Sequence, residues 1–174
     1  MDYRKLLIAV AALAGVIASP ADATPVSAST DASGKAIILV PLTLTKIDDL
    51  EFGSIVPATV TGTVMINATS GARTFTGGVT GVPSDPGHRA YFGGAGTPSQ
   101  QVVVWVTPPT ELTSTSNASD KIPVLLLNID GSPIRSIDPT SRAFFFGVGG
   151  IIQINANQPE GLYEATFDVT AAYL

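Results

Sequence analysis

The chain of 174 residues has no cysteine, one histidine and few charges, which make up 13% of its residues. Without cysteine it can form no disulfide, no thiolate metal site and no thiol nucleophile. The net charge of −5 argues against nucleic-acid binding, which needs clustered lysine and arginine. What remains is rich in Val, Ile, Ala, Gly, Thr and Ser, a composition typical of secreted β proteins.

The N-terminus has the pattern of a secretory signal peptide. Arg4 and Lys5 precede a short apolar run over residues 6–17, and Ala21–Ala23 forms a small-x-small cleavage site. The alternative is a transmembrane anchor, but the run is shorter than the roughly 20 apolar residues that span a bilayer. We predict a signal peptide over residues 1–23, export to the periplasm and then to the cell surface or beyond, and no stable membrane insertion after cleavage.

The next segment, residues 24–35, is small and polar and is predicted to be a flexible leader. If this leader is donated to a neighbouring molecule, its anchoring side chains are Val26, Ala28 and Ala32. The donor could instead extend into the apolar run 36–40, although a central strand of the domain is the preferred interpretation of that run.

Residues 36–174 are predicted to form a single all-β domain, an immunoglobulin-like β-sandwich that is either complete or has an open edge. Short alternating runs separated by Gly, Pro, Asn and Asp turns predict nine or ten strands and no helix. The expected strands lie within residues 36–45, 50–56, 61–68, 73–82, 89–96, 101–107, 122–129, 142–155 and 161–174, with a short edge strand at Leu112. The run 142–155 is expected to be two strands, interrupted at its glycines.

Two aromatic groups allow predictions about burial. Both faces of 101–107 are apolar, which predicts a strand covered on both sides with Trp105 in or beside the core. Phe144, Phe145 and Phe146 are consecutive, so strand geometry predicts that every second ring lies inside. An exposed ring would mark a subunit contact sooner than a sugar-binding site.

The last fourteen residues alternate from Gly161 almost to the end, with Tyr163, Phe167, Val169 and Tyr173 on one face. An apolar face on a terminal strand needs a neighbouring strand or a partner chain. Tyr173 is penultimate and Gly161 is fourteenth from the end, which resembles the closing motif of bacterial chaperone–usher pilins. That resemblance implies a sandwich lacking one strand, held first by a periplasmic chaperone and then by a neighbour's N-terminal segment. The alternative is an ordinary last strand of a complete domain.

A second resemblance covers nearly all of the chain after the signal peptide. The segments Pro41–Lys46, Leu50–Pro57, Phe146–Gly150 and Asn155–Tyr163 resemble the bacterial secreted family of domain of unknown function 4402. This resemblance implies a secreted all-β domain with no known catalytic activity. The family is itself similar to the archaic, spore-coat-U-like pilins in its Phe-Gly element and its closing strand.

No motif in the chain predicts catalysis, a metal site or a cofactor. Ser84, Asp85 and His88 lie in a Pro/Gly turn without a nucleophile elbow, so a catalytic triad is disfavoured. The acidic group at Asp48–Glu51 lacks calcium-loop spacing, and the glycine-rich runs lack the setting of a phosphate loop. We therefore predict a non-enzymatic subunit of a surface filament or other extracytoplasmic assembly, with a periplasmic chaperone and like subunits as partners. The alternative is a monomeric secreted domain that binds a glycan or surface polymer.

Overall fold

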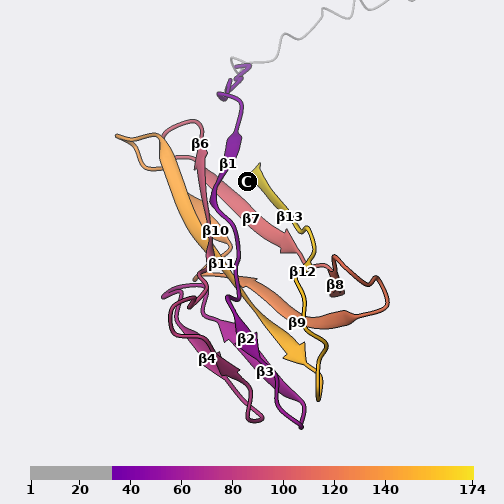
Figure 1. Cartoon of the computed structure of the whole chain (residues 1–174). Coiled ribbons are helices and arrows are strands. Elements are labelled where there is room, and N and C mark those ends of the chain that lie inside the picture. Colours follow the sequence, from indigo (N-terminus) through magenta and orange to yellow (C-terminus); the bar gives the residue numbers. More distant parts are fainter. Residues whose placement is uncertain (1–32) are drawn as a thin grey trace, which may run out of the picture. The chain divides into compact units, whose positions relative to one another are not determined.

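Strands alone build the part of the chain that the computed structural model describes, residues 33–174 (Figure 1). All of these strands belong to one unit, Ile37–Leu174, whereas residues 33–36 belong to a separate N-terminal unit. The predicted all-β class is confirmed, and no helix occurs in residues 33–174. The strands are β1 (Thr43–Asp48), β2 (Ile55–Val56), β3 (Gly62–Ile66), β4 (Arg73–Phe75), β5 (Thr80–Gly81), β6 (Ala90–Ala95), β7 (Gln101–Thr107), β8 (Glu111–Ser114), β9 (Lys121–Ile129), β10 (Ile134–Ser136), β11 (Ala143–Ile154), β12 (Tyr163–Glu164) and β13 (Asp168–Tyr173).

The largest sheet is antiparallel and follows the order β1-β6-β11-β9-β8-β12, with β3 and β4 added beside the second half of β11. The sheet curls into an open half-barrel whose two edge strands, β1 and β12, do not meet. β11 is its centre, because its first half pairs with β6 and its second half with β3 while β9 runs along its other side. The large sheet therefore has two separated edges, one at β1 and one at β12.

A second antiparallel sheet, β10-β7-β13, packs against the large sheet. Their shared core joins Val102 and Val104 of β7 to Phe92, Phe146 and Val148 of the large sheet. A second cluster lies at the other end, where β3, β9 and β11 contribute buried aliphatic side chains: Val64, Ile122, Ile152 and Ile154. Partly buried side chains that include Phe52, Ile55, Leu112 and Tyr163 pack around that second cluster.

The alternation predicted for the three consecutive phenylalanines is confirmed. Phe144 and Phe146 are buried, whereas Phe145 is 52% exposed and stacks on Tyr91. The predicted interruption of this region is wrong, since β11 runs unbroken for twelve residues. Its glycines are places of close approach instead. A Cβ on Gly149 would lie 2.3 Å from the carbonyl oxygen of Ile66, so only glycine lets the neighbouring segment cross the strand here.

Three other local predictions are also wrong. Trp105 is 44% exposed, because the outer face of the three-stranded sheet has no covering layer among residues 33–174. Residues 36–40 form no strand, and Ile37 and Ile38 are strongly exposed. Residues 50–56 contribute only the two-residue β2, since Gly53 takes a positive φ and its backbone turns toward Asp85.

The N-terminal predictions fall outside the described residues. The signal peptide over residues 1–23 and the donor side chains Val26, Ala28 and Ala32 all lie before residue 33. They remain predictions from the sequence.

Candidate partner-strand groove

The C-terminal strand is hydrogen-bonded along one margin only. β13 pairs with β7 from Asp168 to Tyr173, and no other strand of the described chain pairs with it. Figure 1 shows β13 at the border of its sheet, with the C-terminus directly after it. An edge of this kind presents unpaired backbone N–H and C=O groups, which are a template for another strand.

The hydrogen-bond pattern shows which backbone groups of β13 face the free margin. The amide of Val104 donates to Pro133 on the β10 side, so Val104 and its partner Ala171 form a non-hydrogen-bonded pair. The amide of Leu174 donates to Gln101, as the same alternation requires. Ala171 therefore points its N–H and C=O away from β7, as do Val169 and Tyr173.

β12, at the edge of the large sheet, continues this free margin. Ser114 of β8 directs its amide to Asp120, while Thr115 donates to the carbonyl of Leu162. Tyr163 opposite Ser114 is therefore a non-hydrogen-bonded pair whose backbone groups face away from β8. The final stretch of the chain thus carries free backbone groups from β12 through β13.

An open groove lies beside this margin and is called here the edge groove. One wall is residues 49–57, the opposite wall is residues 158–167, and its volume is about 940 Å³. The floor is apolar and comes mainly from the second cluster, with Leu127 added from the shared core. It consists of Leu112, Ile122, Val124, Leu127, Ile152 and Ile154. Leu112 and Val124 are partly exposed and the other four floor residues are buried, so a strand added here would newly cover Leu112 and Val124.

Tyr173 joins the two sides of the fold at the far end of β13. Its hydroxyl donates to the carbonyl of Val40 and accepts from the amide of Thr97, each at 2.8 Å. The amide of Val40 donates in turn to the hydroxyl of Thr97 at 2.7 Å. This link ties the chain before β1 to β13, whereas no such bond joins the groove walls farther along within the described chain.

The five residues predicted from sequence to contact a partner strand fall into two groups. Gly161, Tyr163 and Phe167 line the edge groove. Val169 is outside its lining and packs on the shared core, while Tyr173 forms the link just described. The sequence prediction omitted the floor and the wall 49–57, because these come from distant parts of the chain.

The rim of the edge groove is acidic. Among residues 33–174, no lysine or arginine lines it, and five carboxylates do: Asp49, Glu51, Asp85, Glu160 and Glu164. Lys46 neutralises Asp49 at 2.6 Å, and His88 lies 3.4 Å from Glu51. Glu160 and Glu164 form no ion pair within residues 33–174. The wall that carries the free backbone groups therefore also carries uncompensated negative charge.

Hydrogen bonds from its surroundings lower the pKa of Asp85 on this rim. The hydroxyl of Ser54 donates to the carboxylate at 2.6 Å and is the largest cause, and Arg73 adds a favourable charge. Arg73 itself donates to the carbonyls of Phe52 and Val82. These contacts hold the wall 49–57 in its position. Asp85 makes no hydrogen bond to His88 within the described chain.

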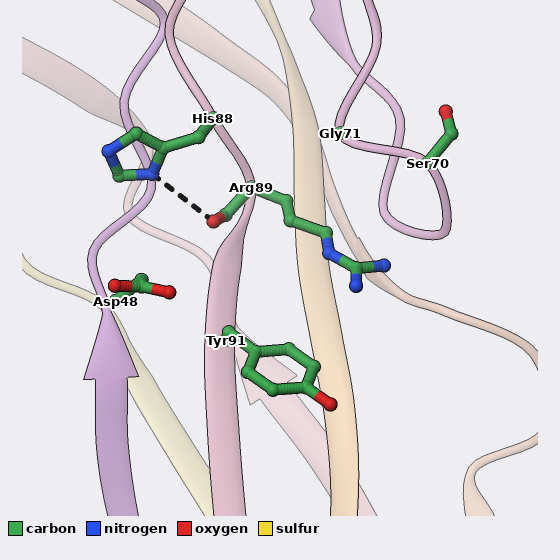
Figure 2. Close-up of a pocket in the computed structure, with 6 residues that line it drawn as sticks. All are labelled: Asp48, Ser70, Gly71, His88, Arg89 and Tyr91. Carbon is green, nitrogen blue, oxygen red and sulfur yellow. Dashed lines mark hydrogen bonds between the residues drawn. The ribbon is translucent and has the colours of Figure 1, made fainter.

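Figure 2 shows a shallower hollow around His88 and Arg89, on the outer face of the large sheet. His88 Nδ1 lies 3.3 Å from the carbonyl oxygen of Arg89. Arg89 donates to the carbonyls of Ala68 and Thr69 and lies over the ring of Tyr91. The cation is thus occupied in holding the loop at Ser70 and Gly71. This arrangement is structural and brings no nucleophile to His88.

Two further features are absent from residues 33–174. No group of three or more His, Asp or Glu side chains there is placed to hold a metal ion. None of those residues belongs to a helix that is long and apolar enough to cross a membrane.

Comparison with known proteins gives one match. The family model described as Domain of unknown function (DUF4402) matches residues 42–173, from just before β1 to the end of β13. Neither the curated proteins nor the solved structures contain a significant match.

Proposed function

The chain belongs to the family of the domain of unknown function DUF4402, and from that premise we propose that it is a non-enzymatic structural subunit joined to like subunits by strand addition. An extended segment of a partner enters the edge groove and pairs with the free margin of the last strands. Main-chain hydrogen bonds supply affinity and the apolar floor fixes the register. The subunit is exported, and its assembly is a surface filament or another extracytoplasmic polymer.

One observation carries this proposal: the free backbone margin and the open apolar floor lie side by side. An unpaired edge strand by itself would not favour strand addition, since many sheets have one. Here Tyr163 turns free N–H and C=O groups toward a groove whose floor includes the partly exposed Leu112 and Val124. An inserted strand would hydrogen-bond to the free backbone groups along its edge. Its alternate side chains would cover the apolar floor.

An open apolar groove needs protection before assembly. A periplasmic chaperone would supply a strand to the same margin first, and the subunit's segment would then replace it. This order keeps an aggregation-prone edge covered during export.

The test uses the chain from Thr24 to Leu174 and combines sedimentation velocity with amide hydrogen exchange. We expect association that grows with protein concentration. In the assembled form the amides of Val169 and Ala171 should gain protection, whereas those of Thr170 and Ala172, which face β7, should be protected in both forms. A chain that stays monomeric at every concentration, and that no extended apolar peptide stabilises, would overturn the proposal in favour of a self-sufficient monomeric domain.

A further inference from the structure

We propose a saccharide-binding platform on the outer face of the large sheet, formed by the rings of Tyr91 and Phe145 together with the hollow of Figure 2. Its ligand is a neutral pyranose sugar within a polysaccharide. This inference goes beyond the proposed function and does not depend on it, because the hollow shares no lining residue with the edge groove.

The two rings form a flat aromatic surface that faces away from the core. They lie within 8° of parallel, with their centroids 6.0 Å apart. The ring of Phe145 lies against Gly93, where an added Cβ would come within 3.0 Å of it, and 52% of Phe145 remains exposed. Figure 2 shows the ring of Tyr91 nearly face-on beside β6, the strand that carries it. The pair therefore presents aromatic surface to solvent.

An aromatic surface of this kind attracts one face of a sugar ring. The face of an aromatic ring carries partial negative charge, whereas the axial C–H groups of a pyranose carry partial positive charge. Stacking therefore combines the burial of apolar surface with electrostatic attraction. An exposed ring also suits a contact with another subunit, as expected from the sequence, so the polar groups beside the rings decide between the two ligands.

The hollow beside Tyr91 supplies polar groups that have no partner of their own. Its volume is about 440 Å³, and it is lined by Asp48, Ser70, Gly71, His88, Arg89 and Tyr91. Within residues 33–174, neither the exposed carboxylate of Asp48 nor the hydroxyl of Tyr91 makes a hydrogen bond. The hydroxyl of Ser70 accepts from the amide of Ala72 at 3.2 Å, so its hydrogen is free to donate. These groups suit sugar hydroxyls, which both donate and accept.

The charges of the hollow favour a neutral ligand. Asp48 and Arg89 supply one carboxylate and one guanidinium to the lining, and His88 lies 3.4 Å from Glu51. An anionic or cationic polymer would therefore gain little net attraction. An apolar side chain from a second copy would bury the Asp48 carboxylate without a partner, which costs free energy. A sugar hydroxyl would instead donate to that carboxylate, so the polar groups favour a saccharide over a subunit contact.

The experiment is affinity electrophoresis of the chain from Thr24 to Leu174 in gels that contain mannan, dextran, galactan or hydroxyethylcellulose. We expect at least one of these neutral polysaccharides to retard the chain. Phe145→Ala and Asp48→Ala should each weaken binding about tenfold, since one removes a stacked ring and the other an acceptor. Trp105→Ala is the matched control, because Trp105 is 44% exposed on the other sheet, and binding should stay within about twofold.

Urea denaturation checks that each variant is folded. If Phe145→Ala fails to fold, Asp48→Ala and Tyr91→Phe decide, because each removes only a group without a hydrogen bond in the described chain. A chain that none of the four polysaccharides retards would overturn the proposal, as would retardation that the platform variants leave unchanged or that Trp105→Ala reduces equally.

Sedimentation velocity of the same variants distinguishes the two uses of the platform. The proposal requires that Phe145→Ala leave self-association unchanged. Self-association that Phe145→Ala lowers, with retardation unaltered, would make the platform a contact between copies and the saccharide assignment wrong. The hydrogen exchange of Val169 and Ala171 tests strand addition separately, so failure at one site is distinguishable from failure at the other.

Discussion

At the scale of single residues, the side chain of Tyr173 shows how the end of the sequence closes one end of the fold. Its ring is partly buried against the shared core, and its hydroxyl bonds to Val40 and Thr97. The residue thus connects three segments far apart in sequence. Tyr173 is part of the C-terminal motif identified in the sequence. In the structure it connects β13 to Val40 and Thr97 and lies outside the lining of the edge groove.

We expect Tyr173→Phe to lower the free energy of unfolding by about 1–2 kcal/mol, because it removes both hydrogen bonds of the hydroxyl while keeping the packed ring. Urea denaturation at pH 7 measures the change. Tyr91→Phe is the control, since the Tyr91 hydroxyl makes no hydrogen bond within residues 33–174, and its effect should be near zero. Equal effects of the two substitutions would show that the Tyr173 hydroxyl contributes nothing.

Asp138 stabilises the loop before β11 in a way that depends on pH. The amide and hydroxyl of Ser141, followed by the amide of Thr140, donate to its carboxylate and lower its pKa below the usual 3.8. Because the folded pKa lies below the unfolded one, the stabilisation is present above about pH 3.8 and is lost as the pH falls through the folded value.

Asp138→Ala should therefore destabilise the domain near pH 7 and have a smaller effect near pH 2. Urea denaturation of both proteins at the two pH values checks this expectation. Asp168→Ala serves as the control, because its carboxylate makes no hydrogen bond or ion pair within the described chain. A loss of stability from Asp138→Ala that is the same at both pH values would contradict the prediction.

At the scale of elements, the two margins of β13 differ, because only one of them is hydrogen-bonded to another strand of the described chain. Thr170 and Ala172 direct their backbone groups to β7, whereas Val169 and Ala171 direct theirs outward. Proline lacks an amide hydrogen, so it is tolerated in an edge strand only where the amide faces outward. Neighbouring alanines therefore allow the two margins to be tested separately.

Ala172→Pro should lower the free energy of unfolding by at least about 1 kcal/mol more than Ala171→Pro, because only the first loses a bond to β7. Ala171→Pro should instead reduce assembly of the chain, since it removes a donor from the free margin. Thermal unfolding and sedimentation velocity of both variants separate the two effects. If Ala171→Pro destabilises the monomer as much as Ala172→Pro, the assignment of margins is wrong.

At the scale of the whole molecule, the proposed assembly would link the stability of the fold to protein concentration. The open groove leaves Leu112 and Val124 partly exposed, and an inserted strand would bind only the folded form. A partner at 100 times its dissociation constant then adds about 2.7 kcal/mol to the free energy of unfolding. The melting temperature of the chain from Thr24 onward should therefore rise with its own concentration.

Calorimetry across a hundredfold range of protein concentration checks this expectation. The Ala171→Pro variant is the control, because it lacks a donor on the free margin, and its melting temperature should rise less over the same range. A constant melting temperature for the unmodified chain would show that assembly does not stabilise the fold.

The sequence by itself determined the features that depend on local alternation. These are the all-β class, the burial of Phe144 and Phe146 with Phe145 outside, and the apolar face of the final stretch that includes Tyr163 and Phe167. Each follows from the two-residue period of a strand, which needs no knowledge of neighbours.

Tertiary structure decided everything that depends on which strands are neighbours. The exposure of Trp105 and the unbroken course of β11 could not be predicted, because a run that is apolar on both faces does not reveal what covers it. The edge groove joins the wall 49–57, a floor from β8, β9 and β11, and the wall 158–167. Such a site exists only when the sheet has curled, since pairing across long stretches of chain, and not local pattern, places its walls face to face.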